Sequence, residues 1–241
     1  MLPKIDLPTY ELKLPSNGKE VIFRPFLVKE EKLLLMAAKS GDANEIIKAT
    51  KQVINNCLLD SDVNVETLPF FDVDCLFIAM RAKSVGESIE VNYICQETNA
   101  DGTPCAGKFP VKIDISNVKV DKNENIKSEI RFNDNLIFYM KYPGYNIIKA
   151  LNDNDDSFEK KIKIIIASID RIFNKDQYYS TKDFSTEELQ NFIEGLTQEQ
   201  FDKLSEFTSN FPSFYVEAKG KCIKCGKEHE VRYKDFVRFF R

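Results

Sequence analysis

Histidine is nearly absent from this sequence, and glycine is scarce. The 241 residues include one histidine and nine glycines. A serine or cysteine nucleophile needs a neighbouring base, usually histidine, and no serine here stands in a glycine-flanked elbow. No glycine-rich loop of the kind that binds phosphate groups is present either. The sequence therefore offers no catalytic constellation, and it predicts a protein that is not an enzyme.

A long uninterrupted hydrophobic run is also missing. The most apolar stretch, residues 162–173, contains Lys163, Ser168, Asp170 and Arg171, whereas a helix that crosses a bilayer needs about 20 apolar residues. The first eight residues contain two prolines and no apolar core, unlike a secretory signal peptide. We therefore expect a soluble cytosolic protein that makes no membrane contact.

The net charge is small and unevenly distributed. The chain has 34 basic and 38 acidic residues, a net charge of −4, so it has no bulk attraction for nucleic acid or anionic lipid. Residues 219–241 nevertheless hold eight Lys or Arg and three acidic residues. The sequence thus has a basic end on an acidic body, and nucleic acid is not the favoured partner.

Two of the six cysteines form a metal-binding pattern. Cys222 and Cys225 are separated by two residues and followed by Gly226, a spacing that lets both thiolates of a tight turn face one metal ion. Disulfides do not persist in a reducing cytosol, which favours metal binding over a disulfide. This pair is typical of one half of a zinc ribbon.

The other half is expected around residue 100. Cys95 and Cys105 stand at opposite ends of a turn-rich loop, in which residues 99–104 resemble an insertion between two ligands. Thiolate-bound zinc contributes on the order of 10 kcal/mol to folding, which two flat hairpins need because they bury little apolar area. We therefore predict that a structural Zn²⁺ is held by four side chains: Cys95, Cys105, Cys222 and Cys225.

Other interpretations of these residues remain open. The four cysteines could be ordinary strand and turn residues, and His229 could replace a cysteine as ligand or be a plain surface residue. A thiol oxidoreductase is a remote alternative, because a redox CxxC normally opens a helix. Cys57 and Cys75 lie on apolar helical faces and are expected in the core.

Hydrophobic periodicity predicts an α+β fold, with helices packed around small antiparallel hairpins and a discontinuous zinc-ribbon-like element. Hairpins are expected at 10–24, 88–115 and 130–140, and strands at 214–221 and 230–233. Helices are expected from Val28 to Gly41, at 46–57, 68–82 and 155–174, and after the capping boxes that begin at Ser185 and Thr197.

This pattern divides the chain into four segments within one or two intimately packed domains. The segments are an N-terminal hairpin with helices (1–87), hairpins with the first half of the ribbon (88–142), a helical region (143–212), and the second half of the ribbon with a basic aromatic tail (213–241). The tail suits docking on a partner as well as packing on the ribbon, through Phe236, Arg238, Phe239, Phe240 and Arg241.

Several stretches resemble a known family. Residues 7–16 (LPTYELKLPS), residues 23–32 (FRPFLVKEEK), Cys95 and the Cys222-x-x-Cys225 pair are similar to the baseplate hub proteins of T-even-type contractile-tailed bacteriophages. The resemblance implies no enzymatic activity. It implies a role in building the central hub of the tail baseplate, with other hub proteins and the tape-measure protein as partners.

We therefore expect a non-enzymatic virion tail protein or assembly factor that acts through protein contacts. It would be present in the host cytoplasm during assembly and in the virion tail baseplate if it remains there. The alternative is a zinc-ribbon protein that binds nucleic acid through its basic ribbon.

Overall fold

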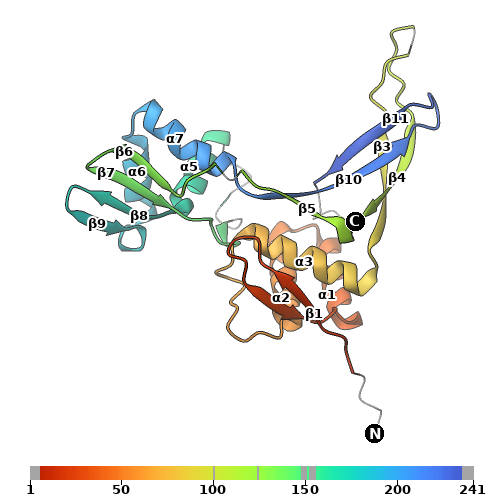
Figure 1. Ribbon diagram of the computed structural model, residues 1–241, viewed down its shortest axis with the longest axis horizontal. Coiled ribbons are helices and arrows are strands. Elements are labelled where there is room, and N and C mark those ends of the chain that lie inside the picture. The colour runs from red at the N-terminus through yellow and green to blue at the C-terminus, as the bar shows by residue number, and fades with distance from the viewer. Residues whose placement is uncertain (1–5, 100, 124, 148–150, 152–155, 235–241) are drawn as a thin grey trace. The chain divides into compact units, whose positions relative to one another are not determined.

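The structure is a computed structural model that describes residues 6–234, apart from residues 100, 124, 148–150 and 152–155. It combines helices with antiparallel sheets (Figure 1), which confirms the predicted α+β class. The chain forms two compact units, each assembled from separate stretches. The first unit comprises Met1–Val63, Asp72–Asp121 and Ser213–Arg241, and the second comprises Asn64–Phe71 and Lys122–Pro212.

The first unit begins with the predicted hairpin. Strands β1 (Tyr10–Lys13) and β2 (Glu20–Phe23) pair antiparallel, and Gly18 in the connecting turn has a φ of 73°. Helices α1 (Val28–Ser40) and α2 (Ala43–Cys57) follow. Gly41 ends α1 in the left-handed conformation, as expected for a glycine that follows a helix.

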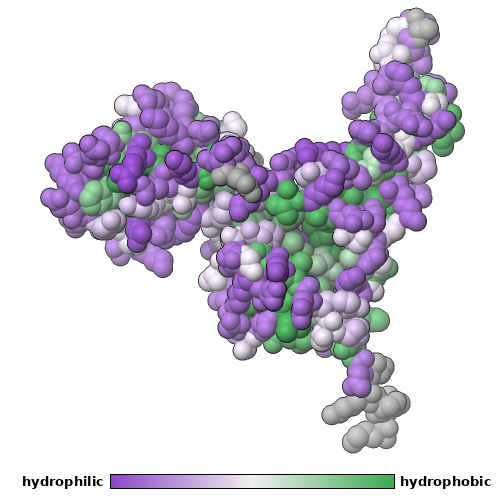
Figure 2. Space-filling model, viewed as in Figure 1, coloured by the Kyte–Doolittle hydropathy of each residue, from purple (hydrophilic) through white to green (hydrophobic). Residues whose placement is uncertain are grey.

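Helix α3 (Phe70–Val85) is the most buried of the three helices, as its apolar residues on most faces predicted. From Asp72 onward it supplies the centre of the first unit, with Val73, Leu76 and Met80 fully buried. In Figure 2 hydrophobic residues also reach the surface where Figure 1 shows α3 and the β1–β2 hairpin. A groove of about 280 Å³ lies there, with Leu12 and Ile78 among its lining residues.

Two hairpins complete the first unit. Strands β3 (Ser88–Ile94) and β4 (Lys108–Asp114) form one of them. Strands β10 (Ser213–Lys221) and β11 (Glu228–Tyr233) form the other, with the short strand β5 (Lys119–Asp121) on the free edge of β10. Both hairpins were predicted, whereas β5 was not. We call β3, β4, β10 and β11 together the ribbon.

The second unit packs helices on a four-stranded antiparallel sheet in the order β6-β7-β8-β9. The strands are β6 (Glu129–Asn133), β7 (Leu136–Met140), β8 (Ile169–Asn174) and β9 (Gln177–Ser180). The helices are α5 (Ser157–Ser168), α6 (Thr186–Glu194) and α7 (Gln198–Ser209). Its core contains Phe138, Ile165, Ile169, Ile193 and Leu204.

Both predicted capping boxes are confirmed. Glu188 accepts a hydrogen bond from the backbone N–H of Ser185 at 2.8 Å, and Ser185 Oγ accepts one from the N–H of Glu188 at 3.2 Å. The N–H of Thr197 donates to the side chain of Gln200 at 3.0 Å in the same way. These bonds satisfy amides that the first turn of a helix leaves unpaired, so α6 and α7 begin where the sequence indicated.

The predicted helix at 155–174 is wrong in its last six residues. Helix α5 ends at Ser168, and β8 follows directly. The spacing of Ile162, Ile165 and Ile169 continues a helical pattern, but the backbone after Ser168 pairs with β7 on one side and β9 on the other. The N–H of Lys141 also donates to the carbonyl of Ser168 at 2.7 Å. Sheet pairing therefore overrides the local period.

Candidate metal centre

The two hairpins of the ribbon bring four cysteines together. Cys95 directly follows β3, and Cys105 lies in the loop before β4. Cys222 directly follows β10, and Cys225 lies in the turn before β11. Their sulfur atoms all lie within 4.8 Å of one another, although the two pairs are more than a hundred residues apart in sequence.

The spacing of the sulfur atoms fits shared coordination. Cys95 Sγ lies 3.7 Å from Cys225 Sγ, and Cys105 Sγ lies 3.8 Å from Cys222 Sγ. Four sulfur atoms at about 2.3 Å from a tetrahedrally coordinated ion stand about 3.8 Å apart. A disulfide would hold two sulfur atoms at about 2.05 Å, and all four cysteines are free thiols. The cluster is therefore compatible with a bound metal ion.

The turn around Cys222 is built to present its sulfur. The N–H of Cys222 donates to the carbonyl of Lys227 at 2.9 Å, and the N–H of Gly226 donates to the carbonyl of Cys222 at 2.9 Å. Gly226 has a φ of 75°, which a glycine adopts without steric cost. The backbone N–H of Cys225, helped by that of Lys224, lowers the pKa of Cys222 to about 7. The turn thus favours a thiolate.

The loop around Cys105 repeats part of this geometry with a different residue after the second cysteine. The N–H of Cys95 donates to the carbonyl of Gly107 at 2.8 Å, and the N–H of Cys105 donates to the carbonyl of Glu97 at 2.7 Å. The residue after Cys105, Ala106, has a φ of 49°, as Gly226 has a positive φ after Cys225. The two loops are therefore similar in backbone as well as in ligand type.

The wide spacing between Cys95 and Cys105 has a structural explanation. Thr98 pairs with Pro104 in an isolated bridge, and the N–H of Asn99 donates to the carbonyl of Thr103 at 2.8 Å. Residues 98 and 99 thus pair with residues 103 and 104, which brings the two ends of the loop back together. The wide spacing, which the sequence analysis interpreted as an insertion, therefore still lets both sulfur atoms reach the cluster.

Because three of the four sulfur atoms are buried, their thiolate forms need a positive charge nearby. Cys95, Cys105 and Cys222 are buried, and Cys225 is exposed. Burial raises the pKa of Cys95 to about 12, because an isolated thiolate is poorly solvated there. A divalent cation at the centre would remove that penalty, since metal binding displaces the thiol proton.

His229 lies beside the cluster. Its Nε2 atom is 3.3 Å from Cys95 Sγ, and its ring stacks on Phe109 with the centroids 5.0 Å apart. Among the described residues, the ligand atoms that all lie within 4.8 Å of one another belong to the four cysteines. His229 is thus placed to hydrogen-bond a sulfur atom, whereas the sequence analysis had considered it as a replacement ligand or a plain surface residue.

Two glycines that the sequence analysis did not single out allow the hairpins to approach closely. A Cβ atom on Gly107 would lie 2.7 Å from Cys222 Sγ, and a Cβ atom on Gly220 would lie 2.5 Å from Val111. Both distances are far below van der Waals contact. The sequence signal was weak, because a glycine in or near a strand indicates close backbone approach without naming the partner.

The comparisons with known proteins give one match. A family model described as T4 bacteriophage base plate protein matches residues 7–241. The chain belongs to this family. No curated protein and no solved structure matches it. Membership in the base plate protein family confirms the predicted resemblance to T4-type baseplate proteins, and it indicates a structural role in the virion tail, in contact with other baseplate components.

In this base plate protein, the stretch at 23–32 has a folding role. Glu30 is buried and pairs with Arg24 at 3.1 Å, and its other oxygen accepts the N–H of Leu27 at 2.8 Å. Burial opposes ionisation of Glu30, but these hydrogen bonds outweigh it and lower its pKa. Arg24 also donates to the carbonyl of Asn56 at 2.8 Å. The stretch therefore ties the first hairpin to α1 and α2.

The remaining predicted residues fall into two groups. Cys57 is buried as expected, and Cys75 is partly buried; burial raises the pKa of Cys57 to about 11 and that of Cys75 to about 12. The predicted partner-binding residues lie outside the described part of the chain: Phe236, Arg238, Phe239, Phe240 and Arg241. Over the described residues, each helix is too short or too polar to cross a membrane.

The setting of the Cys222–Cys225 pair differs from that of a redox site. The pair lies in a turn between two strands, whereas a redox CxxC opens a helix whose N-terminus stabilises the thiolate. In the ribbon, the backbone N–H groups of Cys225 and Lys224 stabilise the thiolate of Cys222 instead. The geometry thus favours metal ligation over a dithiol that alternates between reduced and oxidised forms.

Proposed function

We propose that this baseplate protein is a non-enzymatic tail component or assembly factor. It helps to build the central hub by binding other hub proteins and the tape-measure protein, and this assembly takes place in the host cytoplasm. A structural Zn²⁺ on Cys95, Cys105, Cys222 and Cys225 holds the ribbon together. The observation that carries the role is the family match over residues 7–241.

Zinc is the ion that the ligand set favours. Four thiolates around one centre suit Zn²⁺ or an iron–sulfur cluster, whereas hard cations prefer oxygen ligands. The distances of 3.7 and 3.8 Å between sulfur atoms match a single ion of zinc size. Four thiolates around Zn²⁺ carry a net charge of −2, and Lys224 Nζ lies close by, donating to the carbonyl of Cys105 at 2.6 Å.

Metal analysis tests this assignment. We expect elemental analysis of the purified chain to find one equivalent of zinc, and Co²⁺ that replaces it to give the absorption of tetrahedral thiolate coordination. The variant His229→Ala should keep the ion, because we assign His229 a hydrogen bond to Cys95 rather than a coordination bond. Loss of zinc in that variant would make His229 a ligand instead.

An exposed apolar surface on α1 supports a role in protein contacts. Val28, Leu35 and Met36 are 81%, 54% and 62% exposed. At 3.6 residues per turn all three point to the outer side of the helix, with Val28 two turns before Leu35 and Met36. The opposite side of α1 buries Leu34 and Ala37 in the core. Large apolar side chains gathered at the surface mark interaction sites more often than single ones do.

Charge around this surface indicates the chemistry of a partner. The exposed charged residues of α1 are all cations: Lys29, Lys32 and Lys39. Of the two acids in α1, Glu30 is buried and Glu31 is half-buried. An apolar stripe with a lysine rim fits a partner surface that is apolar at its centre and acidic at its edge.

Helix α2 offers a matched control, since its exposed side is polar throughout and includes Gln52 and Asn55. The double variant Leu35→Ser with Met36→Ser should reduce recovery of identified hub proteins and of tape-measure protein when the chain is purified from infected cells. Gln52→Ser with Asn55→Ser should leave recovery unchanged. Equal recovery with both variants would remove α1 from the proposed contact.

The nucleic-acid alternative has less support in the ribbon. Lys219 pairs with Glu230 at 3.2 Å, and Lys227 pairs with Glu97, so part of the basic charge is already neutralised within the chain. Titration against single-stranded DNA and RNA distinguishes the two functions. Salt-sensitive binding that is lost when the ribbon lysines are replaced would favour the alternative.

A further inference from the structure

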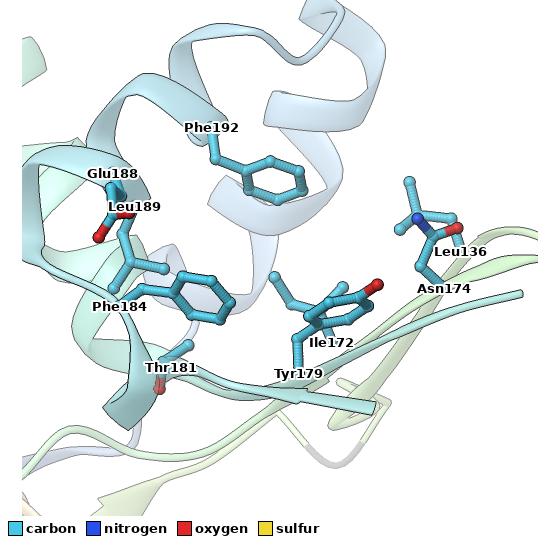
Figure 3. A pocket seen from close by; sticks show the side chains of 9 residues that line it. All are labelled: Leu136, Ile172, Asn174, Tyr179, Thr181, Phe184, Glu188, Leu189 and Phe192. Atoms are coloured by element: carbon cyan, nitrogen blue, oxygen red, sulfur yellow. The ribbon is translucent and has the colours of Figure 1, made fainter. Parts of the chain in front are cut away.

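An apolar pocket opens on the second unit between α6 and the strands β8 and β9. Its volume is about 330 Å³, at the lower end of the range of about 300–1,000 Å³ for pockets that hold ligands. Figure 3 shows the ring of Phe192 on one side and that of Tyr179 on the other, with Glu188 towards one end and Asn174 towards the other. The middle of the pocket is thus aromatic and its ends are polar.

The aromatic walls are only partly covered. Phe192 packs its ring on Phe138, with the centroids 6.0 Å apart, yet it is 42% exposed. Phe184, which lies near Tyr179 at 6.3 Å, is exposed to a similar extent. Two half-exposed phenylalanines that line one pocket leave apolar surface in water, and covering it would be favourable.

The surroundings of the pocket are acidic. Residues 174–194 supply seven of its nine lining residues and contain five acids and two lysines. Glu188 is held in place because its Oε2 atom accepts hydrogen bonds from the N–H and the hydroxyl of Ser185, at 2.8 and 2.7 Å. Its Oε1 atom has no hydrogen-bond partner among the residues that the structure describes. A fixed carboxylate therefore stands at the end of an aromatic pocket.

The C-terminal tail has the complementary chemistry. Residues 234–241 (KDFVRFFR) combine three phenylalanines and three cations with one acid. Phenyl rings suit the aromatic walls of the pocket through offset or edge-to-face contacts. An arginine beside Phe239 or Phe240 suits the free oxygen of Glu188, since arginine forms strong hydrogen bonds to carboxylates.

We propose that this pocket binds the tail, residues 235–241, of a second copy of the chain, so that the protein self-associates. Reciprocal exchange of tails closes a dimer, whereas exchange in one direction continues into a ring or a chain. This inference goes beyond the proposed baseplate role and does not depend on it, because self-association is measured on the purified chain alone.

A labelled peptide tests the recognition directly. A fluorescent peptide with the sequence of residues 234–241 is titrated into the full-length variant Phe236→Ser with Phe239→Ser and Phe240→Ser, whose own tail cannot compete. We expect saturable binding that weakens as salt is added. The same peptide with its three phenylalanines replaced by serine should not bind.

Three variants, each made in that tail-substituted chain, locate the peptide. Phe192→Ser should lower the affinity about tenfold or more, because it removes an aromatic wall. Phe158→Ser is the matched control: Phe158 is 53% exposed in the same unit and packs on Phe201 at 5.3 Å, but it does not line the pocket. Glu188→Gln keeps the cap on Ser185, so it should reduce the affinity and its salt dependence without unfolding α6.

Sedimentation of the full chain tests the self-association. The mass of the unmodified chain should rise with concentration, and both Phe192→Ser and the tail substitutions should return it to the monomer. A monomer at every concentration overturns the second copy as the occupant. A peptide that does not bind, or that binds Phe192→Ser and Phe158→Ser equally well, overturns the pocket as the site.

Discussion

The ribbon and the second unit reach a stable fold by different means. In the ribbon, β3 has no buried residue, and each of the other strands buries two or three: Phe109, Val111 and Ile113 in β4, Phe214 and Val216 in β10, and Val231 and Tyr233 in β11. In the second unit, helices and sheet enclose a continuous cluster of ten buried apolar residues. A thin pair of hairpins buries too little apolar area to be stable alone. The comparison indicates that a metal ion on the cysteine cluster, as proposed above, would supplement a small core in the ribbon.

Removing one ligand should have the largest effect. Without Cys222 the remaining thiolates cannot complete a tetrahedral site, so Cys222→Ser should release the zinc and lose about 10 kcal/mol of apparent stability in the ribbon. Hydrogen exchange should accelerate at β10 and β11 and stay slow at β7 and β8. Elemental analysis measures the metal, and Cys75→Ser, which changes a thiol outside the cluster, is the control. Unchanged metal content and protection would contradict the proposed centre.

A core substitution should give the opposite pattern. Leu204 is fully buried in the second unit, and Leu204→Ala should destabilise that unit by about 2–5 kcal/mol through lost burial and a cavity. The zinc content should stay at one equivalent, because the four cysteines belong to the first unit. Denaturant unfolding followed together with metal release checks this. Zinc loss at the same denaturant concentration as unfolding of the sheet would show that the two regions are not independent.

Crowding the cluster should have an intermediate effect. A methyl group in Gly107→Ala meets Cys222 Sγ and Lys224 Cβ, at 2.7 and 2.8 Å before any shift. Because the loop must move to accept it, we expect a loss of about 1–3 kcal/mol, the usual cost of overpacking. Competition with a zinc-binding dye should show weaker metal affinity. The control is Gly195→Ala, since a Cβ atom at this position comes no closer than 3.4 Å to its neighbours.

The smallest expected effect is a gain in stability. Ala106 has a φ of 49°, a conformation that costs a residue with a side chain about 1 kcal/mol or more. Ala106→Gly removes that strain but adds about 0.4–1 kcal/mol of unfolded-state entropy, so we expect a net gain below about 1 kcal/mol. Thermal unfolding of the zinc-bound chain measures it. A loss of stability would mean that the loops around Cys105 and Cys225 differ more than their backbones indicate.

Much of the fold could be predicted because its signals are local. The turn at Gly18, the end of α1 at Gly41 and the capping boxes at Ser185 and Thr197 each depend on residues a few positions apart. Such signals survive in any tertiary context in which the element forms. The strand β8 could not be predicted in this way, because the isoleucines of 162–172 fit one continuous helix as well as a helix followed by a strand.

The same distinction between local signals and contacts of distant segments applies to the candidate site. The sequence indicated which cysteines resemble ligands, because the CxxC spacing and the interrupted pair at 95 and 105 are chemical patterns within short segments. It gave no signal that β10 packs on β4 through Gly220, or that Gly107 faces Cys222, since these contacts join segments more than a hundred residues apart. The pocket beside α6 was missed because its walls come from three strands and a helix, and the sequence does not show which of their side chains stay uncovered after packing.

The sequence by itself determined most of the element types, the α+β class, the four cysteines and the resemblance to T4-type baseplate proteins. The tertiary structure brings the four sulfur atoms together as the sequence predicted. It alone decided that the chain forms two units from interleaved stretches and that residues 169–174 are a strand. The physical reason is range: caps, turns and ligand spacing act over a few residues, whereas strand pairing and hairpin packing depend on which distant surfaces are available to cover each other.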